Sequence, residues 1–497
     1  MCKKYISLFI ATMMLLGTLV SCGVELPGSS HGGTSGTQTE NSSGESLDIP
    51  ETRYNGEELV FLTIAGSEGW ATSHQIFTEE LTSQSNNFST AVYERNDQIL
   101  QQYGVTIKDY PQGYDKHKMT VQNETAAPTG DFKAIATNVR TQVDMASSGF
   151  LWNLNSDYIE YLNLNKPWWD GKIADGLSIN DKLFFATGDI MTTDNDATFI
   201  IMFNKQMVKD YSIPDLYGMV EDHSWTMDKL YEYEQLVIQD LDSDSKMTLD
   251  KDVYGLAYTG DAPSCFLAAG GITLCRKDSE DIPYYEMDID RAQSIADLGK
   301  LIMNSSCSVN LYAQMHLYDD DIVKAGHTAF GENHALFYAE VMQSVTRMRN
   351  LDIDFGVLPF PKYNAEQASY YSFMHSSAGA VSIPRSVNDH DIVMVSSMLE
   401  AMAYYSVDTL TVEYYDINLK AKGSRDEKSA PMIDLILANR VYDLAYYFGW
   451  GNNAFGSLAG CLTPNSTTSV SSLNQRFKPM IKRSIEDIVS KMDKFDD

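Results

Sequence analysis

Glu58-Leu59-Val60-Phe61-Leu62-Thr63-Ile64 is a short run rich in β-branched and aromatic residues, and it ends at Ala65-Gly66. Such residues favour a strand, and the glycine that follows favours a turn. A helical stretch at residues 91–103 and a second strand at residues 105–107 come next in the chain. Strand and helix therefore alternate, which predicts an α/β fold.

Further strand candidates recur along the chain, separated by helical segments such as residues 392–405. They are residues 132–137, 182–187, 198–203, 335–338, 355–358 and 378–383. From residue 431 onward the pattern predicts helices only, including residues 474–494. A chain of 497 residues is long enough for two such α/β lobes.

The first 55 residues have the composition of an export signal and a linker. Lys3 and Lys4 precede an apolar run that is too short to span a bilayer, and Leu19-Val20-Ser21-Cys22-Gly23 resembles the lipobox of bacterial lipoproteins. We therefore expect residues 1–21 to be a lipoprotein signal peptide. Acylation of Cys22, with palmitate among the acyl chains, would hold the protein on the extracellular face of the cell membrane. Residues 22–55 are rich in Gly, Ser and Thr, which predicts a flexible tether.

Charge and cysteine content narrow the function classes. The net charge of −31 disfavours nucleic acid as a partner, because phosphate binding needs clustered Lys and Arg. The six cysteines form no CxxC pair, which argues against a zinc ribbon or a thioredoxin-type site. Cys265 and Cys275 are close enough in sequence for a disulfide, but free buried thiols are an equal alternative.

Several short motifs occur in a fixed order behind the lipobox. They are Ala91-Val92-Tyr93-Glu94-Arg95-Asn96, Ile201-Met202-Phe203-Asn204-Lys205, Trp225-Thr226-Met227-Asp228-Lys229-Leu230, Tyr254-Gly255-Leu256, Ala268-Ala269-Gly270-Gly271 and Phe355-Gly356-Val357-Leu358-Pro359-Phe360-Pro361-Lys362. Each motif is weak alone, but the series resembles extracellular solute-binding protein family 1, the sugar-binding lipoproteins of ABC transporters. The resemblance runs from about residue 56 to the end of the chain.

The resemblance implies a two-lobed periplasmic-binding-protein-like fold of type II, with a ligand in the cleft and closure about a hinge. Lobe one would comprise residues 56–195 plus 366–430, and lobe two residues 196–365 plus 431–497, with extra C-terminal helices. The chain would cross between lobes near residues 189–198 and 361–371. We expect a monomer whose partner is an ABC permease.

Candidate ligand contacts lie at loops and strand ends. A sugar presents C–H faces that pack on aromatic rings and hydroxyls that bond to polar side chains, so its site needs both kinds of residue. The candidates are Trp70, Asn138, Arg140, Asp194, Asp196, Asp261, Glu340, His375 and Trp450. Trp225 and Trp168 are instead expected to pack within their lobes.

An acidic loop has the spacing of a calcium site. Asp240, Asp242 and Asp244 occupy positions 1, 3 and 5 of an EF-hand-like loop. The remaining predicted ligands are the carbonyl of Lys246, Thr248 and Asp252. Ser245 replaces the usual glycine and Lys251 stands at position 12, so a solvated acidic turn is the alternative to a structural Ca²⁺.

The function implied is a lipid-anchored binding protein that captures a carbohydrate, such as an oligosaccharide, for an ABC importer without catalysis. One alternative is a secreted carbohydrate-active enzyme, which needs two carboxylates at a defined separation. Asp194, Asp261 and Glu340 are the candidates for such a pair. Another is the same fold with a peptide or other small solute. The chain has no GxSxG, HExxH or P-loop motif to indicate a particular reaction.

Overall fold

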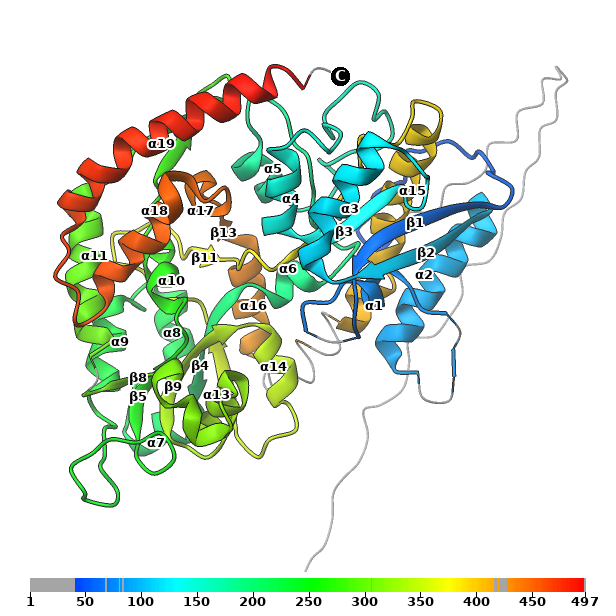
Figure 1. Ribbon diagram of the computed structural model, residues 1–497. Helices are drawn as coiled ribbons and strands as arrows, with labels where there is room; N and C mark the ends of the chain where they lie inside the picture. Colours follow the sequence, from blue (N-terminus) through cyan, green and yellow to red (C-terminus); the bar gives the residue numbers. More distant parts are fainter. Residues whose placement is uncertain are drawn as a thin grey trace, which may run out of the picture. The chain divides into compact units, whose positions relative to one another are not determined.

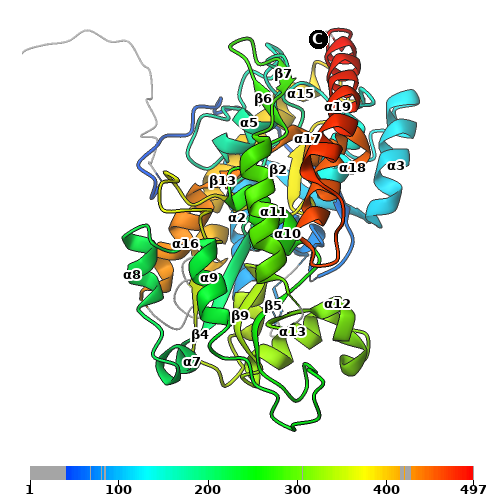
Figure 2. The same cartoon turned by 90° about the vertical axis from the view of Figure 1, so that its left-hand side faces the viewer.

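The computed structural model describes residues 41–67, 69–79, 81–82, 85–304, 306–414, 419 and 427–495. Its strands form two main sheets that lie in different parts of the molecule (Figures 1 and 2). Sheet 1 has the order β12 (Gly379–Ser382), β3 (Ala134–Asn138), β1 (Glu57–Ile64) and β2 (Val105–Gln112). Sheet 2 has the order β10 (Phe355–Leu358), β4 (Phe199–Asn204), β9 (Ala335–Val341), β5 (Tyr254–Tyr258) and β8 (Ser308–Asn310).

Sheet 1 is built around β1, which pairs in parallel with β2 and β3, while β12 runs antiparallel to β3. Leu59 and Phe61 face one core of sheet 1 and Leu62 faces another, so β1 is covered on both sides. A parallel strand that is buried on both faces has a nearly continuous run of apolar residues. The sequence predicts β1 well because it contains such a run.

Helix α2 (Asn87–Tyr103) shows how local signals fix an element. The Asn86 side chain accepts a hydrogen bond from Ser89 N, and the helix ends at Gly104, whose φ of 69° is left-handed. Its buried face includes Arg95, which is 0% exposed. The Arg95 guanidinium donates to the carbonyls of Gln75, Ile76 and Ile190, so it ties α2 to the end of α1 (Ser73–Ile76) and to the first inter-sheet connection.

The chain passes between the sheets through segments that we call the first crossing, residues 189–198, and the second crossing, residues 359–378. The first crossing leads from the region of sheet 1 to β4, and the second leads from β10 back to β12. The second crossing contains β11 (Ser372–Phe373), which pairs in parallel with β13 (Arg440–Val441). The α/β class predicted from the sequence is confirmed, whereas the exact lobe boundaries stay a prediction.

The remaining helices cover the sheets and fill the region after residue 427. Before β10 they are α1 (Ser73–Ile76), α3 (Tyr114–Ala126), α4 (Val139–Ala146), α5 (Gly171–Leu177), α6 (Thr193–Asp196), α7 (Lys205–Asp210), α8 (Leu216–Glu221), α9 (Met227–Glu234), α10 (Ala262–Ala269), α11 (Ile289–Ile302), α12 (Leu311–Gln314), η1 (Met315–Tyr318), α13 (Ile322–Gly331) and α14 (Gln343–Met348). After β12 they are α15 (Asp391–Ser406), α16 (Ser429–Ala438), α17 (Leu444–Tyr447), α18 (Trp450–Ala459), η3 (Gly460–Leu462) and α19 (Val470–Met492). A small hairpin joins β6 (Cys275–Lys277) to β7 (Pro283–Tyr285).

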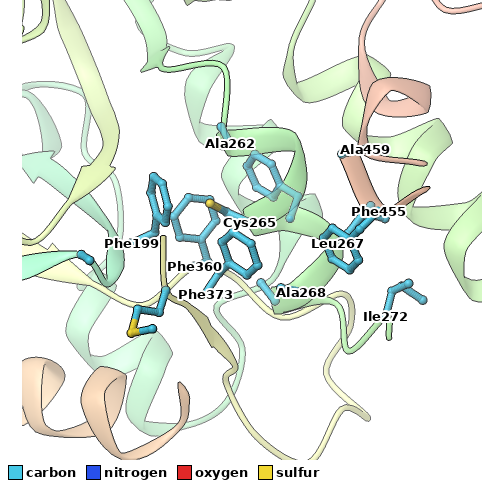
Figure 3. Close-up of a cluster of buried hydrophobic side chains, with 14 of the residues drawn as sticks. Phe199, Ala262, Cys265, Leu267, Ala268, Ile272, Phe360, Phe373, Phe455 and Ala459 are labelled. Atoms are coloured by element: carbon cyan, nitrogen blue, oxygen red, sulfur yellow. The ribbon is translucent and has the colours of Figure 1, made fainter. Parts of the chain in front are cut away.

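A core of aromatic side chains packs where the second crossing meets α10 and α18 (Figure 3). The ring of Phe373 lies 6.0 Å from that of Phe199 and 6.0 Å from that of Phe455. Offset aromatic contacts at this separation add to the area that they bury. The crossing, β4 and the C-terminal helices are thus joined by one apolar cluster.

Three expectations need correction. Residues 182–187 do not form a strand; they make two isolated bridges, from Lys182 to Ile179 and from Ala186 to Val381 in β12. The region after residue 431 is not all helical, because β13 pairs with β11. The predicted tether is not free beyond residue 40: Leu47 and Ile49 are buried, and Lys166 pairs with Glu45 and Asp48 at 3.1 and 3.0 Å.

Cys22, the signal peptide and residues 22–40 lie outside the described residues. Cys265, Cys275, Cys307 and Cys461 are all free and buried, so the disulfide alternative does not apply. Within the described ranges, no helix is both long and apolar enough to cross a bilayer.

Candidate functional site

The carboxyl ends of four strands supply the candidate site. Trp70 follows β1, Arg140 lies in the first turn of α4 after β3, Asp261 follows β5, and Glu340 lies near the end of β9. In α/β sheets, ligands bind in the crevice beyond these strand ends. With His375 of the second crossing, these residues are here named the central site: Trp70, Arg140, Asp261, Glu340 and His375.

His375 is at the centre of this group. Its ring stacks on Trp70 at a centroid distance of 6.2 Å and an interplanar angle of 26°, and it meets the edge of Phe199 at 6.1 Å. Arg140 Nη2 donates to Ser376 Oγ at 3.2 Å, beside His375. The loop after β1, helix α4 and the second crossing therefore converge on one point.

Charge interactions join the two sheets at the same point. Burial raises the pKa of the Glu340 carboxyl to about 7, and the charge of Asp261 contributes to the rise. Burial lowers the pKa of His375; Asp261 opposes this shift and Arg140 adds to it. The central site thus combines the Arg140 guanidinium with an imidazole whose pKa is lowered and a carboxyl whose pKa is raised.

A cavity of about 900 Å³ adjoins the central site. Gln343 Nε2 donates to the carbonyl of Gly69 at 3.2 Å, which links α14 to the loop that carries Trp70. The cavity wall combines aromatic rings with charged and amide groups, including Ser67, Asn86, Phe88, Asp196, Arg347 and Tyr414. This volume and this mixture of side chains suit a polar ligand with apolar faces.

A larger cavity, of about 960 Å³, lies between residues 154–181 and the β6–β7 hairpin. Its lining includes Asn155, Asn163, Trp169 and Lys277. Neither cavity is lined by a central-site residue, but the 900 Å³ cavity is lined by Gly69, the neighbour of Trp70, and by Gln343, which donates to the Gly69 carbonyl. We place the ligand site at the strand ends instead, because aromatic and ionisable groups from both sheets converge there.

Asp196 and Asn138 have structural partners. Asp196 is 5% exposed, accepts hydrogen bonds from the Tyr414 hydroxyl and from Gln343 Nε2, and lines the 900 Å³ cavity. Burial raises its pKa to about 7. Asn138 accepts a hydrogen bond from Thr141 N and so caps α4, and it is 9% exposed. Asp196 can still face a ligand, whereas the Asn138 side chain is committed to its helix.

Two further predicted contacts, Asp194 and Trp450, are buried against protein partners. Asp194 is 3% exposed and pairs with Arg440 Nη1 at 3.0 Å, so its carboxylate is already neutralised. Trp450 is 6% exposed and packs in the core against Phe448, with ring centroids 5.4 Å apart. The flanking glycines suggested a projecting ring, but the C-terminal helices enclose it.

Four residues of the site region were missed from sequence. Gln343 and Arg347 lie on α14, which follows β9 in the chain and was not predicted from the sequence. Tyr312 follows β8 and interacts with the charges of Asp261 and Glu340. Tyr446 interacts with Asp261 and hydrogen-bonds Ser376, and burial raises its pKa to about 12. Of these four residues, only Tyr312 could have been found from the sequence, because it follows a strand. That strand, β8, has just three residues and is therefore difficult to predict.

The acidic loop brings Asp240, Asp242 and Asp244 together, with one carboxylate oxygen of each within 4.8 Å of the others. Ser245 adopts a φ of 66°, the conformation usually supplied by glycine at this position of the loop. Asp240 Oδ1 and Thr248 Oγ1 are buried and have no hydrogen-bond partner in the part of the chain described here.

Two features of the loop differ from the prediction. Both carboxylate oxygens of Asp252 are taken, because they accept hydrogen bonds from Leu241 N at 2.9 Å and Thr248 N at 2.7 Å. Asp252 therefore closes the loop through its two backbone hydrogen bonds. Lys251 Nζ lies 3.2 Å from Asp242 Oδ2, where it neutralises part of the charge.

No protein-family model matches the chain, and no curated protein matches it in sequence. Solved structures do match. The GacH receptor of Streptomyces glaucescens, solved unliganded and with acarbose, is 12% identical with a TM-score of 0.52 over 87% of this chain and 99% of that one. RafE of Streptococcus pneumoniae, in its apo form, is 11% identical with a TM-score of 0.53 over 86% and 98%.

The maltose/maltodextrin-binding domain of Bdellovibrio bacteriovorus, bound to maltotriose, is 11% identical with a TM-score of 0.50 over 86% of this chain and 99% of that one. At these identities the likeness establishes the fold. The chain therefore has the periplasmic-binding-protein-like fold of these solved structures, as the ordered motifs in its sequence predict.

Proposed function

We propose that this protein is a solute-binding protein that captures a carbohydrate, such as an oligosaccharide, in the central site and the adjoining cavity. It delivers the sugar to an ABC importer and is held on the extracellular face of the membrane by a lipid on Cys22. Binding needs no chemistry, because a ligand that contacts both sheets stabilises the arrangement that encloses it.

The observation that carries this proposal is the Trp70–His375 stack beside Asp261, Glu340 and Arg140. A half-buried indole offers a flat face for the C–H surface of a sugar ring, and the polar groups match its hydroxyls. Proteins of the same fold have been solved with acarbose and maltotriose, which gives two probe ligands.

Calorimetric titration of the purified protein with maltotriose and acarbose tests the proposal, with a tripeptide and spermidine as competing solute classes. Saturable heat with a sugar and none with the other two supports a carbohydrate receptor. Binding of only the peptide or the polyamine would instead assign the fold a different solute.

One observation favours a second candidate, a glycoside hydrolase. Glu340 has a pKa of about 7 and interacts with the charge of Asp261, as an acid paired with an ionised carboxylate would. A hydrolase would release reducing sugar from maltotriose and lose that activity in Glu340→Gln. A receptor would leave maltotriose intact under the same conditions.

We also propose that the loop of Asp240, Asp242 and Asp244 holds a structural Ca²⁺. Three converging carboxylates and an unbonded Asp240 Oδ1 match the hard oxygen ligands that Ca²⁺ prefers. The Lys246 carbonyl and Thr248 Oγ1 complete the proposed set. Lys251 beside Asp242 would weaken the affinity without removing it.

The calcium proposal predicts that Ca²⁺ raises the melting temperature and that a chelator reverses the rise. Saturation to about 100 times the dissociation constant stabilises a folded state by about 2.7 kcal/mol. Asp240→Asn should abolish the shift, whereas Asp319→Asn, which alters an exposed carboxylate paired with Lys324, should leave it intact. Equal melting temperatures with Ca²⁺ and with chelator would count against the site.

A further inference from the structure

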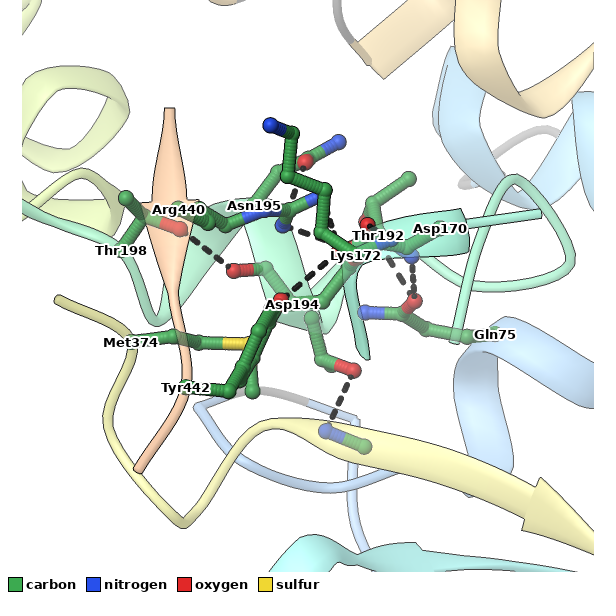
Figure 4. Close-up of polar contacts among 12 residues, drawn as sticks. Gln75, Asp170, Lys172, Thr192, Asp194, Asn195, Thr198, Met374, Arg440 and Tyr442 are labelled. Atoms are coloured by element: carbon green, nitrogen blue, oxygen red, sulfur yellow. Dashed lines mark hydrogen bonds and ion pairs between the residues drawn. The ribbon is translucent and has the colours of Figure 1, made fainter. Parts of the chain in front are cut away.

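Four consecutive residues, Arg440-Val441-Tyr442-Asp443, contact every part of the chain that surrounds the two crossings. We call this segment the junction. Arg440 and Val441 form β13 and pair with Ser372 and Phe373 in the second crossing. The junction therefore reaches the second crossing through the backbone of β13, and its polar side chains make further contacts (Figure 4).

The Arg440 side chain holds the first crossing. Its Nη1 lies 3.0 Å from Asp194 Oδ2 and 3.3 Å from Asn195 Oδ1, both in the first crossing. Its Nη2 lies 3.0 Å from Asp170 Oδ2, in the loop before α5 (Figure 4). A planar guanidinium that spans two carboxylates fixes their relative position, which a single ammonium cannot do.

Tyr442 and Asp443 extend these contacts in two directions. The Tyr442 hydroxyl lies 2.7 Å from Asp170 Oδ2 and 3.8 Å from the Met374 sulfur. Asp443 Oδ2 accepts hydrogen bonds from Leu274 N at 2.6 Å and Cys275 N at 3.1 Å, at the start of the β6–β7 hairpin. The junction thus bridges the loop before α5, both crossings and the chain between β5 and β8.

Arg440 and Asp443 of the junction are buried, so solvent weakens the ionic contacts of Arg440 less than it would at the surface. Arg440 is 8% exposed, and the side chains of Asp170 and Asp194 in the ion pairs are 8% and 4% exposed. Moving one crossing away from Arg440 would leave a buried charge without its partner, and this would raise the free energy of the protein. A hinge moves because a few of its residues are free to change their backbone dihedral angles.

The contacts of the junction within the two crossings lie beside residues of the candidate site. Asp194 and Asn195 are followed by Asp196, which lines the 900 Å³ cavity. Met374 precedes His375, which stacks on Trp70. The junction therefore contacts the backbone segments that carry Asp196 and His375, at the residues that precede them.

We propose that Arg440 is a positioning residue that holds the two crossings in a fixed relation and thereby sets how Asp196 and His375 face the ligand. This inference rests on the proposed function for its effect on binding, but not for its effect on the crossings. Removing one arm of the guanidinium contact should loosen both crossings together and speed the release of bound sugar.

Arg440→Lys tests this, with Arg276→Lys as the matched control because the Arg276–Glu286 pair, at 3.6 Å, is on the surface. Hydrogen–deuterium exchange on the ligand-free protein should rise about tenfold in residues 194–198 and in residues 372–376. The dissociation rate of maltotriose, followed by tryptophan fluorescence, should rise about tenfold with little change in the association rate. Arg276→Lys should change none of these quantities.

Tyr442→Phe removes only the hydroxyl contacts, to Asp170 and to the Met374 sulfur, and serves if Arg440→Lys does not fold. It should raise exchange in the same two segments by about threefold. Faster exchange confined to residues 440–443, or to one crossing alone, would overturn the proposal, as would an unchanged dissociation rate with both crossings loosened. If the wild-type protein binds neither maltotriose nor acarbose, the sugar assignment fails while the exchange data still decide whether the junction couples the crossings.

Discussion

Trp70→Ala is expected to weaken carbohydrate binding by about 30-fold or more, because it removes the flat face on which a sugar ring would stack. Truncating a central aromatic anchor in a binding site costs about 2 kcal/mol or more. The Trp70 side chain is only half buried, so its loss should leave the fold largely unperturbed. Calorimetric titration with the probe sugar measures the effect directly.

Trp70→Phe and Trp450→Phe are the informative companions. A phenyl ring keeps part of the stacking face, so Trp70→Phe should retain an intermediate affinity. Trp450 is buried in the core, so Trp450→Phe should lower the melting temperature and leave the affinity of the folded protein almost unchanged. Equal affinities for wild-type protein and Trp70→Ala would show that the ligand does not contact the central site.

A matched pair of charge variants separates the contributions of the polar groups. Arg140 donates to Ser376 and interacts with His375, so Arg140→Met should lower affinity by removing a hydrogen-bond donor next to the stack. Arg349→Met, at the rim of the neighbouring cavity, changes the same charge farther from the stack. A larger loss for Arg349→Met would move the centre of the binding site from the stack to the cavity.

The residues that the sequence placed well share one physical reason. Trp70, Arg140, Asp261 and Glu340 each lie at or after the carboxyl end of a parallel-paired strand, and such ends meet at one edge of a sheet. The strands themselves were predictable because β1, β4 and β9 are apolar over most of their length. The position of a residue relative to a strand depends only on its neighbours in the chain, so a single sequence is enough to predict it.

The failures depend on partners that are distant along the chain. Asp194 looked like an exposed acid on a loop, but its partner is Arg440, 246 residues away. Residues 440–441 form a strand only because β11 lies beside them, and a two-residue pairing leaves no pattern in the sequence. Burial of Trp450 likewise follows from how the C-terminal helices pack, which its flanking glycines do not reveal.

The second large effect expected is a loss of stability as the pH rises from 5 to 8. Burial raises the pKa to about 7 in four carboxyl groups, those of Asp189, Asp196, Glu340 and Glu400. In the unfolded chain such groups titrate near 4. A carboxyl with a higher pKa in the folded state binds its proton more tightly there, so it stabilises the fold below about pH 4. That contribution is lost as the pH rises toward 7.

Glu400 provides the clearest test because it lies in the core, away from the candidate site. It is 2% exposed, and it accepts hydrogen bonds from Trp168 Nε1 at 3.1 Å and Trp169 Nε1 at 2.8 Å. These indole donors favour the charged form, but burial outweighs them and the net shift is upward. Its loss of protonation should cost about 2 to 3 kcal/mol between pH 5 and 8.

Urea unfolding at pH 5, 6, 7 and 8 measures this dependence. Wild-type protein should lose several kcal/mol across the range, and Glu400→Gln should show a shallower slope because its side chain no longer titrates. Glu58→Gln, at an exposed ion pair with Lys108, should keep the wild-type slope. The net charge of −31 would also destabilise the fold at high pH by self-repulsion. That effect changes almost equally in the two variants, so a difference in slope between them isolates the buried carboxyl. Identical slopes would mean that Glu400 is already ionised at pH 5 and that its two indole donors outweigh the cost of burial.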